Sequence, residues 1–318
     1  MVWEPLLELI TPIFYIIGAT FLFFIFLYFL HRFIKMSSLK FKTQAKQRGE
    51  FVDLKSYKTK DGYDLSLNGQ INKKNKKIII SIHDFKSTKN EYDNLISYFI
   101  KKNLDIDIIA YDQRGCGKNA VYKDASQATF ISDLDEIIES INEKYPKKKI
   151  ILLTSGFSSH MALYFSSNPK IEKIIITSFK INKGYRNGIS NIIKCIIGFI
   201  FYQKIKLKDK LNGIDLIDDE KISKEIDVNH LEKGTYTFRE TLQNYIIKRR
   251  TKKYINNAKC KITLILPNLD IYTKQKKLAK FINKLDKQKY KLNTLKDCKH
   301  FWLYKYNEQN FENIISKI

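Results

Sequence analysis

Short apolar runs alternate with longer amphipathic stretches through most of the chain. Stretches around 89–102 and 127–144 have the spacing of helices that bury one face. Runs rich in Ile and Leu lie at 76–82, 105–111, 148–154, 170–179 and 261–267. Near-continuous apolar runs are typical of strands that are buried on both faces. The alternation therefore predicts βαβ units and a mostly parallel sheet flanked by helices, an α/β fold.

The N-terminal segment has a different pattern. From Leu9 to Leu30 no side chain carries a formal charge. At a rise of about 1.5 Å per residue, this segment makes a helix of about 33 Å, long enough to cross the hydrocarbon core of a bilayer. A cleaved signal peptide is disfavoured, because no basic region precedes the run and no small-x-small cleavage site follows it. Residues 1–35 are therefore predicted to be a permanent transmembrane anchor.

Charges on either side of this anchor predict its orientation. Glu4 and Glu8 precede it. The basic residues that follow it are Arg32, Lys35, Lys40, Lys42, Lys46 and Arg48. The positive-inside rule then places the N-terminus outside and the large domain in the cytoplasm. We expect a single-pass protein of the cell membrane with a basic linker at 36–50.

Composition limits the classes of function. The chain has 318 residues, of which 44% are apolar, so residues 51–318 suffice for one large α/β domain with a substantial core. The net charge is +24, but only seven of the 57 basic residues are Arg. Because base and phosphate recognition favours the forked guanidinium, no nucleic-acid partner is expected. We interpret the net positive charge as favouring adhesion of the domain to the anionic lipid bilayer.

One segment, residues 148–165, predicts a buried strand, an abrupt turn and a helix. This is the shape of a nucleophile elbow, where a hydrolase presents its attacking side chain. Gly156 lies at the turn, and the positions two before and two after it, Thr154 and Ser158, are suitably small. Ser158 remains an alternative nucleophile, although that register would put a histidine in a tight slot. A register on Ser155 would put large residues in both slots.

Other segments carry motifs in a recognisable order. They are a hairpin at 51–70 with its turn at Asp61 and Gly62, KKIIISIHDFKS, DIDIIAYDQRGCGKNA, KITLILPNLDIY and LKDCKHFW. Together with the elbow, they resemble the α/β-hydrolases of the serine aminopeptidase and monoacylglycerol lipase (lysophospholipase) type over about five-sixths of the chain. The resemblance implies an α/β-hydrolase fold with Asp270 as the catalytic acid and His300 as the catalytic histidine. It also implies an oxyanion hole formed by the N–H groups of Phe85 and Phe157.

Two positions depart from the family pattern. Gly156 stands where the family has its nucleophilic serine, which would prevent formation of an acyl-enzyme by the usual route. Asp84 stands where the family has the Gly of its His-Gly pair, and its charge would repel a developing oxyanion. We therefore expect a serine-hydrolase-like protein that is catalytically impaired or a pseudohydrolase. The alternative is an active esterase or aminopeptidase that uses Ser158 or a water activated by His300.

A cap over the site is expected between the strands at 170–179 and 261–267. About 80 residues, 182–259, lie in this interval, which is too long for one crossover. The segment 190–206 would form its most apolar helix, which could pack in the core of the cap, line an acyl-chain pocket or touch the bilayer. A membrane-anchored, lipase-like fold with an apolar cap suggests a lipidic or acyl ligand.

The remaining reactive side chains carry no strong signal. His83 is expected to have a structural part and His160 to be packed or on the surface. The four cysteines, Cys116, Cys195, Cys260 and Cys298, have neither a CxxC pair nor a metal-like spacing. Free thiols, no metal and no cofactor are therefore expected.

Overall fold

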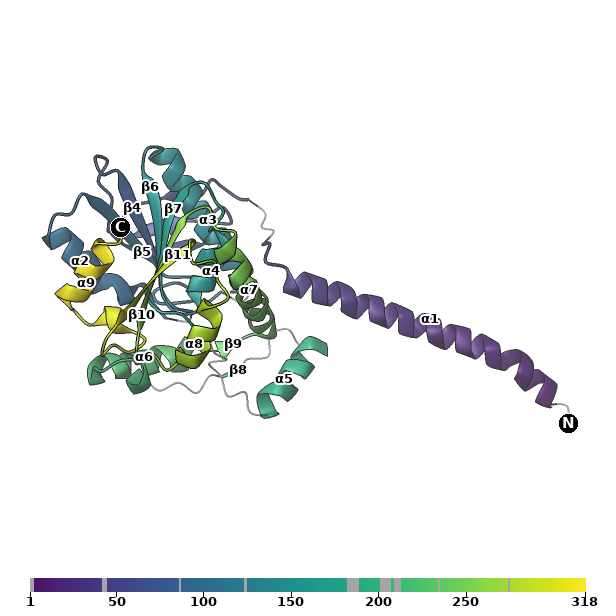
Figure 1. Cartoon of the computed structure of the whole chain (residues 1–318). Helices are drawn as coiled ribbons and strands as arrows, with labels where there is room; N and C mark the ends of the chain where they lie inside the picture. The colour runs from purple at the N-terminus through teal and green to yellow at the C-terminus, as the bar shows by residue number, and fades with distance from the viewer. Residues whose placement is uncertain are drawn as a thin grey trace.

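A nine-stranded sheet forms the centre of the protein in this computed structural model (Figure 1). Its strands are β1 Glu50–Phe51, β2 Ser56–Lys58, β3 Asp64–Gln70, β4 Lys77–Ile82, β5 Ile106–Tyr111, β6 Lys149–Thr154, β7 Ile171–Ile176, β10 Lys261–Pro267 and β11 Tyr290–Leu295. They lie in the order β1-β2-β3-β5-β4-β6-β7-β10-β11. A separate two-stranded sheet pairs β8 Leu207–Lys208 with β9 Thr235–Tyr236.

The structure describes most of the chain. The described residues are 3–41, 45–85, 87–122, 125–181, 189–200, 207–208, 213–233, 235–273 and 275–318. Parts of the predicted cap, such as 182–188 and 201–206, therefore lie outside the described residues.

The sheet is parallel from β5 to β11 in its spatial order and antiparallel at the other edge. β4 pairs in parallel with β5 and β6, and β7 pairs in parallel with β6 and β10. β3 runs antiparallel to β5. The central strands are almost entirely buried, as expected for apolar runs covered on both faces. The mostly parallel sheet predicted from the sequence pattern is thus confirmed.

Helices cover both faces of the sheet. The helices of the described residues are α1 Trp3–Ser37, α2 Asp93–Lys101, α3 Gln127–Lys144, α4 Ser158–Tyr164, α5 Ile189–Ile200, α6 Glu220–Lys233, α7 Phe238–Asn256, α8 Gln275–Ile282 and α9 Glu308–Ile315, with 3-10 turns at Lys89–Tyr92, Gly213–Asp215 and Trp302–Tyr304. One core cluster joins the sheet to α3, α4, α7 and α8, and a second joins it to α2 and α9.

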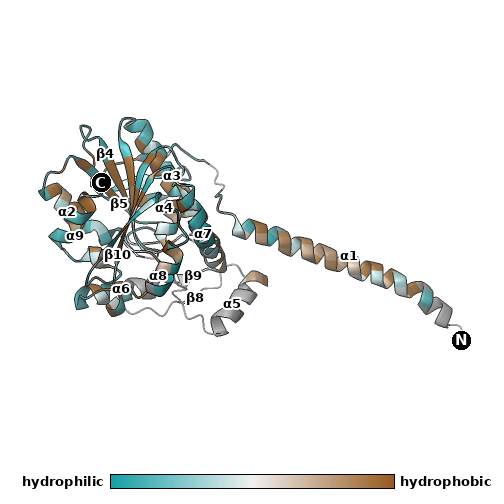
Figure 2. Cartoon of the chain, in the orientation of Figure 1, coloured by the Kyte–Doolittle hydropathy of each residue, from teal (hydrophilic) through white to brown (hydrophobic). Residues whose placement is uncertain are grey.

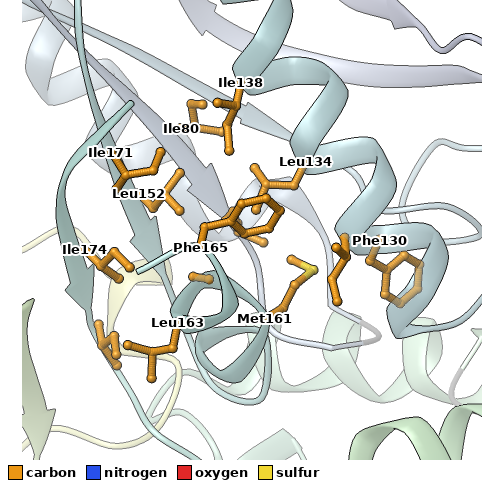
Figure 3. Packing of buried hydrophobic residues seen from close by; sticks show 14 of the residues in the cluster. Ile80, Phe130, Leu134, Ile138, Leu152, Met161, Leu163, Phe165, Ile171 and Ile174 are labelled. Atoms are coloured by element: carbon orange, nitrogen blue, oxygen red, sulfur yellow. The ribbon is translucent and has the colours of Figure 1, made fainter. Parts of the chain in front are cut away.

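Alternate side chains along each strand supply these two cores. Ile80 and Leu152 from neighbouring strands pack against Leu134 of α3 and Met161 of α4 (Figure 3). The residues next to them in the chain, such as Ile79, face the opposite core. Because both faces are apolar, the sheet is held between two helical layers and its strand ends keep a fixed position.

Helix α1 extends away from the rest of the molecule and is apolar along most of its length (Figures 1 and 2). Its segment Ile10–Ser37 is long and apolar enough to cross a membrane, a criterion that a signal sequence would also meet. The chain after α1 turns onto α7, where Gln243 Nε2 donates to the carbonyls of Met36 (3.1 Å) and Ser38 (2.8 Å). The same side chain accepts from Ala128 N at 3.0 Å. One glutamine therefore ties the end of α1 to α3 and α7.

Candidate functional site

The side chains of interest follow the carboxyl ends of the parallel strands, where ligands bind in open α/β sheets. Asp270 follows β10 and His300 follows β11. His300 Nδ1 lies 3.0 Å from Asp270 Oδ1. The carboxylate of Asp270 also accepts from Tyr272 N (2.8 Å) and Thr273 Oγ1 (2.9 Å), which fixes its orientation toward the ring. The predicted acid and histidine positions are thus brought together by the fold.

Asp84, which follows β4, contacts the other side of the same ring. Its Oδ2 lies 3.1 Å from His300 Nε2, so both ring nitrogens of His300 have carboxylate partners. Its Oδ1 accepts from Phe85 N and Phe157 N, each at 2.6 Å. These are the two N–H groups that the sequence analysis assigned to an oxyanion hole. The Asp84 carboxylate itself occupies the space in front of them.

A lysine that the sequence analysis did not identify completes the group. Lys180 Nζ lies 3.1 Å from Asp84 Oδ2 and 4.0 Å from the centre of the Tyr272 ring. Its side chain is 5% exposed, so this ion pair is shielded from water. No motif marks Lys180. Its position after β7, beside the elbow strand β6, is the signal that could have drawn attention to it.

The charges of this group shift the pKa values of its members. Burial alone would raise the pKa of Asp84, but Lys180, His300 and the N–H donors hold it well below its usual range. Burial alone would lower the pKa of His300, but the carboxylates of Asp270 and Asp84 raise it to about 9. At neutral pH the imidazole is therefore protonated and the Asp84 carboxyl is ionised.

Glu91 lies behind Asp84 and has the opposite behaviour. Its Oε2 accepts from Asp84 N at 3.2 Å, and the residue is 1% exposed. Burial raises the pKa of Glu91 to about 7, and the negative charge of Asp84 pushes in the same direction. The cluster thus holds its ionised carboxylates next to cations, whereas Glu91, which lies further back, is only about half ionised near pH 7.

Gly156 forms the turn between β6 and α4. Its φ of +56° lies in the left-handed region, which suits a sharp strand-to-helix turn. Gly156 N donates to Ser178 Oγ at 2.7 Å. A Cβ built on Gly156 would overlap the carboxyl carbon and both oxygens of Asp84. The Asp84 side chain therefore fills the space that any side chain at position 156 would need.

The alternative serine has a different partner. Ser158 is 1% exposed, and its Oγ accepts from Gln113 Nε2 at 3.0 Å. Gln113 Nε2 also donates to the carbonyl of His83, so Ser158 belongs to a network between the ends of β4, β5 and β6. Since Asp84 and Asp270 engage both nitrogens of His300, the ring has no hydrogen bond left to offer Ser158 in this arrangement.

Two further buried histidines support the loops around the site. His83 Nδ1 lies 2.7 Å from the Asp84 carbonyl, and His83 Nε2 accepts from Gln113 N at 2.9 Å. His160 Nε2 lies 3.0 Å from the Lys180 carbonyl. Burial lowers the pKa of His160 to about 3, so that ring is neutral and donates to the carbonyl. His83 and His160 thus hold the backbone of the two residues that form the ion pair.

The described part of the chain contains no candidate metal site. There, no three His, Cys, Asp or Glu side chains are grouped so that they could hold a metal ion. Cys116 and Cys260 are buried free thiols, and Cys298 is a partly exposed one. The side chain of Cys195 lies outside the described residues.

Comparison with known proteins gives a consistent result. A family model described as serine aminopeptidase, S33, matches residues 73–307. A soluble variant of monoglyceride lipase from Saccharomyces cerevisiae, solved with a substrate analogue, has a TM-score of 0.64 at 14% identity, covering 87% of this chain and 95% of that one. A monoacylglycerol lipase from Paleococcus ferrophilus has a TM-score of 0.64 at 15% identity, covering 80% and 97%.

An α/β-hydrolase from Penicillium sp. sh18 is also similar, with a TM-score of 0.60 at 14% identity over 82% of this chain and 95% of that one. None of the curated protein sequences compared with the chain matches it.

Proposed function

Because the chain belongs to the serine aminopeptidase S33 family, we propose that it is a membrane-anchored, lipase-like α/β-hydrolase protein whose acyl-transfer chemistry is blocked by its own Asp84. The α/β-hydrolase fold predicted from the sequence is confirmed by the family match and the similar structures. In the present chain this fold keeps the acid and histidine positions of a hydrolase without the hydrolytic reaction.

One observation carries the proposal, the position of Asp84 Oδ1. It accepts hydrogen bonds from both Phe85 N and Phe157 N. In acyl transfer these two donors would hold the oxygen of the tetrahedral intermediate, and such donors contribute about 3 to 4 kcal/mol each. An ester carbonyl cannot reach them while the carboxylate is present. The carboxylate of Asp84 therefore already occupies the place where the negatively charged oxygen of the tetrahedral intermediate forms in an active hydrolase.

The nucleophile position supports the same conclusion. We propose that Gly156 occupies the place of the family's serine, since it forms the left-handed turn between β6 and α4. No hydroxyl can project from it. The overlap between a Cβ at this position and the Asp84 carboxyl means that Asp84 can take this position only while residue 156 is a glycine.

The protonation state of His300 disfavours a rescue by water. A general base must be unprotonated before it can accept a proton. With its pKa raised to about 9, His300 is mostly protonated at neutral pH and acts as a hydrogen-bond donor to Asp84 and Asp270. Lys180, Asp84, His300 and Asp270 then form a group with two positive and two negative charges, which is electrically balanced without a ligand.

The similarity to lipases and the membrane-spanning length of α1 favour a lipid as the class of ligand. The similar structures include lipases of Saccharomyces cerevisiae and Paleococcus ferrophilus. Helix α1 would keep the domain at a bilayer, oriented with the domain in the cytoplasm as its basic flank indicates. We propose that the chain binds a lipid or acyl compound as a binding or scaffold protein.

A fluorophosphonate probe tests the blocked site, because it reacts only with an activated serine. The wild-type chain should remain unlabelled. The double variant Asp84→Gly with Gly156→Ser should be labelled, and should hydrolyse p-nitrophenyl butyrate at least about 100-fold faster than wild type, given the contribution of free oxyanion donors. Each single variant should stay at background. Adding His300→Ala to the double variant should abolish both signals.

Three outcomes would overturn the proposal. Labelling of a serine in the wild-type chain that His300→Ala abolishes would show an active hydrolase using another serine, with Ser158 the first to examine. Ester hydrolysis by wild type that depends on His300 but without labelling would show an activated water. A double variant that unfolds like wild type yet has no activity would show that Asp84 and Gly156 are not what blocks the reaction.

A further inference from the structure

Helix α5 packs against the end of α1 that adjoins the domain. The ring of Phe199 in α5 lies 5.7 Å from that of Phe29 and 6.5 Å from that of Phe33, centre to centre. On its other side Phe199 lies 5.8 Å from Phe238, the first residue of α7. Figure 1 shows α5 beside this end of α1 and outside the layers that cover the sheet. One aromatic ring therefore joins α1, α5 and the domain.

The position of Phe29 determines how deep α5 would lie. Phe29 belongs to the stretch Leu9–Leu30, which has no formally charged side chain, whereas Arg32 and Lys35 follow it. If α1 spans a bilayer, its uncharged stretch fills the hydrocarbon core and the cations lie among the headgroups. A helix that packs on Phe29 then reaches the boundary between headgroups and acyl chains.

The outward side of α5 suits that boundary. Ile193 and Ile197 are one helical turn apart and are 51% and 42% exposed. Lys194, next to Ile193, is exposed as well. Apolar side chains that share a helix face, with cations beside them, are typical of helices that lie in the interface of an anionic membrane.

A hydrogen bond between α1 and α7 also stabilises the contact between α1 and the domain. Met36 is 1% exposed, and its carbonyl accepts from Gln243 of α7. Because the last turn of α1 is held at Met36 and α1 contacts α5 at Phe199, α5 should stay close to the membrane once α1 has inserted.

We infer that α5 is a second membrane-contacting helix, which inserts Ile193 and Ile197 into the headgroup–acyl boundary of the same anionic bilayer that α1 spans. The inference rests on the membrane anchor in the proposed function, but not on the blocked site. An anionic lipid surface fits the exposed face of α5 best. The chain has a net charge of +24, and Arg32 and Lys35 at this end of α1 would lie at the same boundary.

Tryptophan quenching by brominated lipids tests the inference on the full-length chain. The protein is reconstituted into vesicles of phosphatidylcholine and phosphatidylglycerol whose acyl chains are brominated near the carbonyl end. Trp3→Phe removes the tryptophan in α1, and Trp302, which is 5% exposed, gives a constant background. Ile193→Trp reports on α5, and Phe23→Trp reports on α1.

Ile100→Trp is the matched control. Ile100 lies in α2, on the far side of the sheet from α1 (Figure 1), and is 51% exposed, like Ile193. We expect Ile193→Trp to be quenched at least about twofold more than Ile100→Trp, as for a side chain buried by an interfacial helix. Lowering the phosphatidylglycerol content or raising the salt should weaken the quenching at position 193 and leave that at position 23 unchanged.

The three reporters separate the possible failures. Equal quenching of Ile193→Trp and Ile100→Trp, with strong quenching of Phe23→Trp, would overturn the inference and leave the anchor intact. Weak quenching of Phe23→Trp would overturn the anchor itself. A blue-shifted Ile193→Trp emission without quenching would mean that a second copy of the chain, and not lipid, covers α5, which would also overturn the inference.

Discussion

At the scale of single residues, Asp84 and Gly156 act as a pair. The Asp84 carboxyl occupies the volume of a side chain at position 156, and it satisfies the N–H groups of Phe85 and Phe157. Buried donors that lose their acceptor typically destabilise a protein by about 1 to 3 kcal/mol each. Asp84 therefore contributes to stability at the same place where it prevents acyl transfer.

This pairing predicts a measurable coupling. Gly156→Ala should destabilise the wild-type chain by about 3 kcal/mol or more, because the new Cβ displaces the Asp84 carboxyl from its donors and adds left-handed strain. In an Asp84→Gly background the left-handed backbone strain at position 156 remains, but the new Cβ no longer overlaps a carboxyl. Gly156→Ala should then lower the free energy of unfolding by only about 1 to 2 kcal/mol. Urea denaturation of wild type, the two single variants and the double variant measures the coupling. Additive effects would contradict the pairing.

Sequence reasoning identified Asp84 as an anomaly but could not predict its geometry. A carboxylate in the oxyanion loop was expected to repel charge in the hole, whereas its Oδ1 accepts the hydrogen bonds of the hole itself. The direction of the Asp84 side chain is set by the turn that follows β4. The pattern of apolar and polar residues along the chain does not predict the shape of such a turn. Lys180 was missed for a related reason: its partner Asp84 is distant in sequence, and only the adjacency of the strand ends brings them together.

At the scale of elements, the apolar runs predicted the buried strands well. β4, β5, β6, β7 and β10 coincide with those runs because burial on both faces leaves an unbroken apolar pattern. β11 was not recognised, since it is an edge strand with mostly exposed or half-exposed side chains and the sequence YKLNTL. The predicted helix at 127–144 is α3, which starts at a Ser126–Thr129 capping box.

Gln243 connects three elements, so its loss should have effects at a distance. Gln243→Leu removes the donor for the Met36 and Ser38 carbonyls and the acceptor for Ala128 N. We expect a loss of about 2 to 4 kcal/mol in the free energy of unfolding. We also expect faster trypsin cleavage of the basic linker after α1, because its attachment to α7 is released. Urea titration and limited proteolysis measure the two effects.

Gln288→Leu, at an exposed position, is the control for Gln243→Leu and should leave both readouts unchanged. If Gln243→Leu destabilised the chain but left the cleavage rate of the linker unaltered, Gln243 would support only α3 and α7.

At the scale of the whole molecule, composition predicted the excess of positive charge but not its distribution. Several buried cations are matched by carboxylates, such as Lys148 with Asp107 at 2.6 Å and Lys89 with Asp112 at 2.9 Å. The Lys180–Asp84 pair belongs to the same class. Pairing of this kind is required because an isolated buried charge is strongly unfavourable. Exposed cations such as Lys194 can act on a lipid headgroup layer.

The balanced cluster around His300 makes overall stability depend on pH in a defined direction. The pKa of His300 is raised from 6.5 to about 9 in the folded chain, so its contribution is complete below 6.5 and is lost as the pH rises through about 9. Burial raises the pKa values of Glu91 and Asp133 to about 7, so their contribution to stability is lost as the pH rises from about 4 to about 7, which is below the range in which His300 titrates. Between about pH 7.5 and about pH 9.5, the free energy of unfolding should therefore fall by about 2 kcal/mol on account of His300.

Denaturant titrations of detergent-solubilised protein at several pH values measure this slope, and His300→Gln is the matched variant. A neutral amide cannot titrate, so the variant should be less stable than wild type at about pH 7.5 and should lack this part of the slope. Since Asp84 keeps Lys180 as a partner in that variant, the carboxylate stays ionised and the comparison isolates the imidazole. Equal slopes in the two proteins would mean that His300 is neutral in the folded state. The ring could then accept a proton, and the physical argument against an activated water would no longer hold.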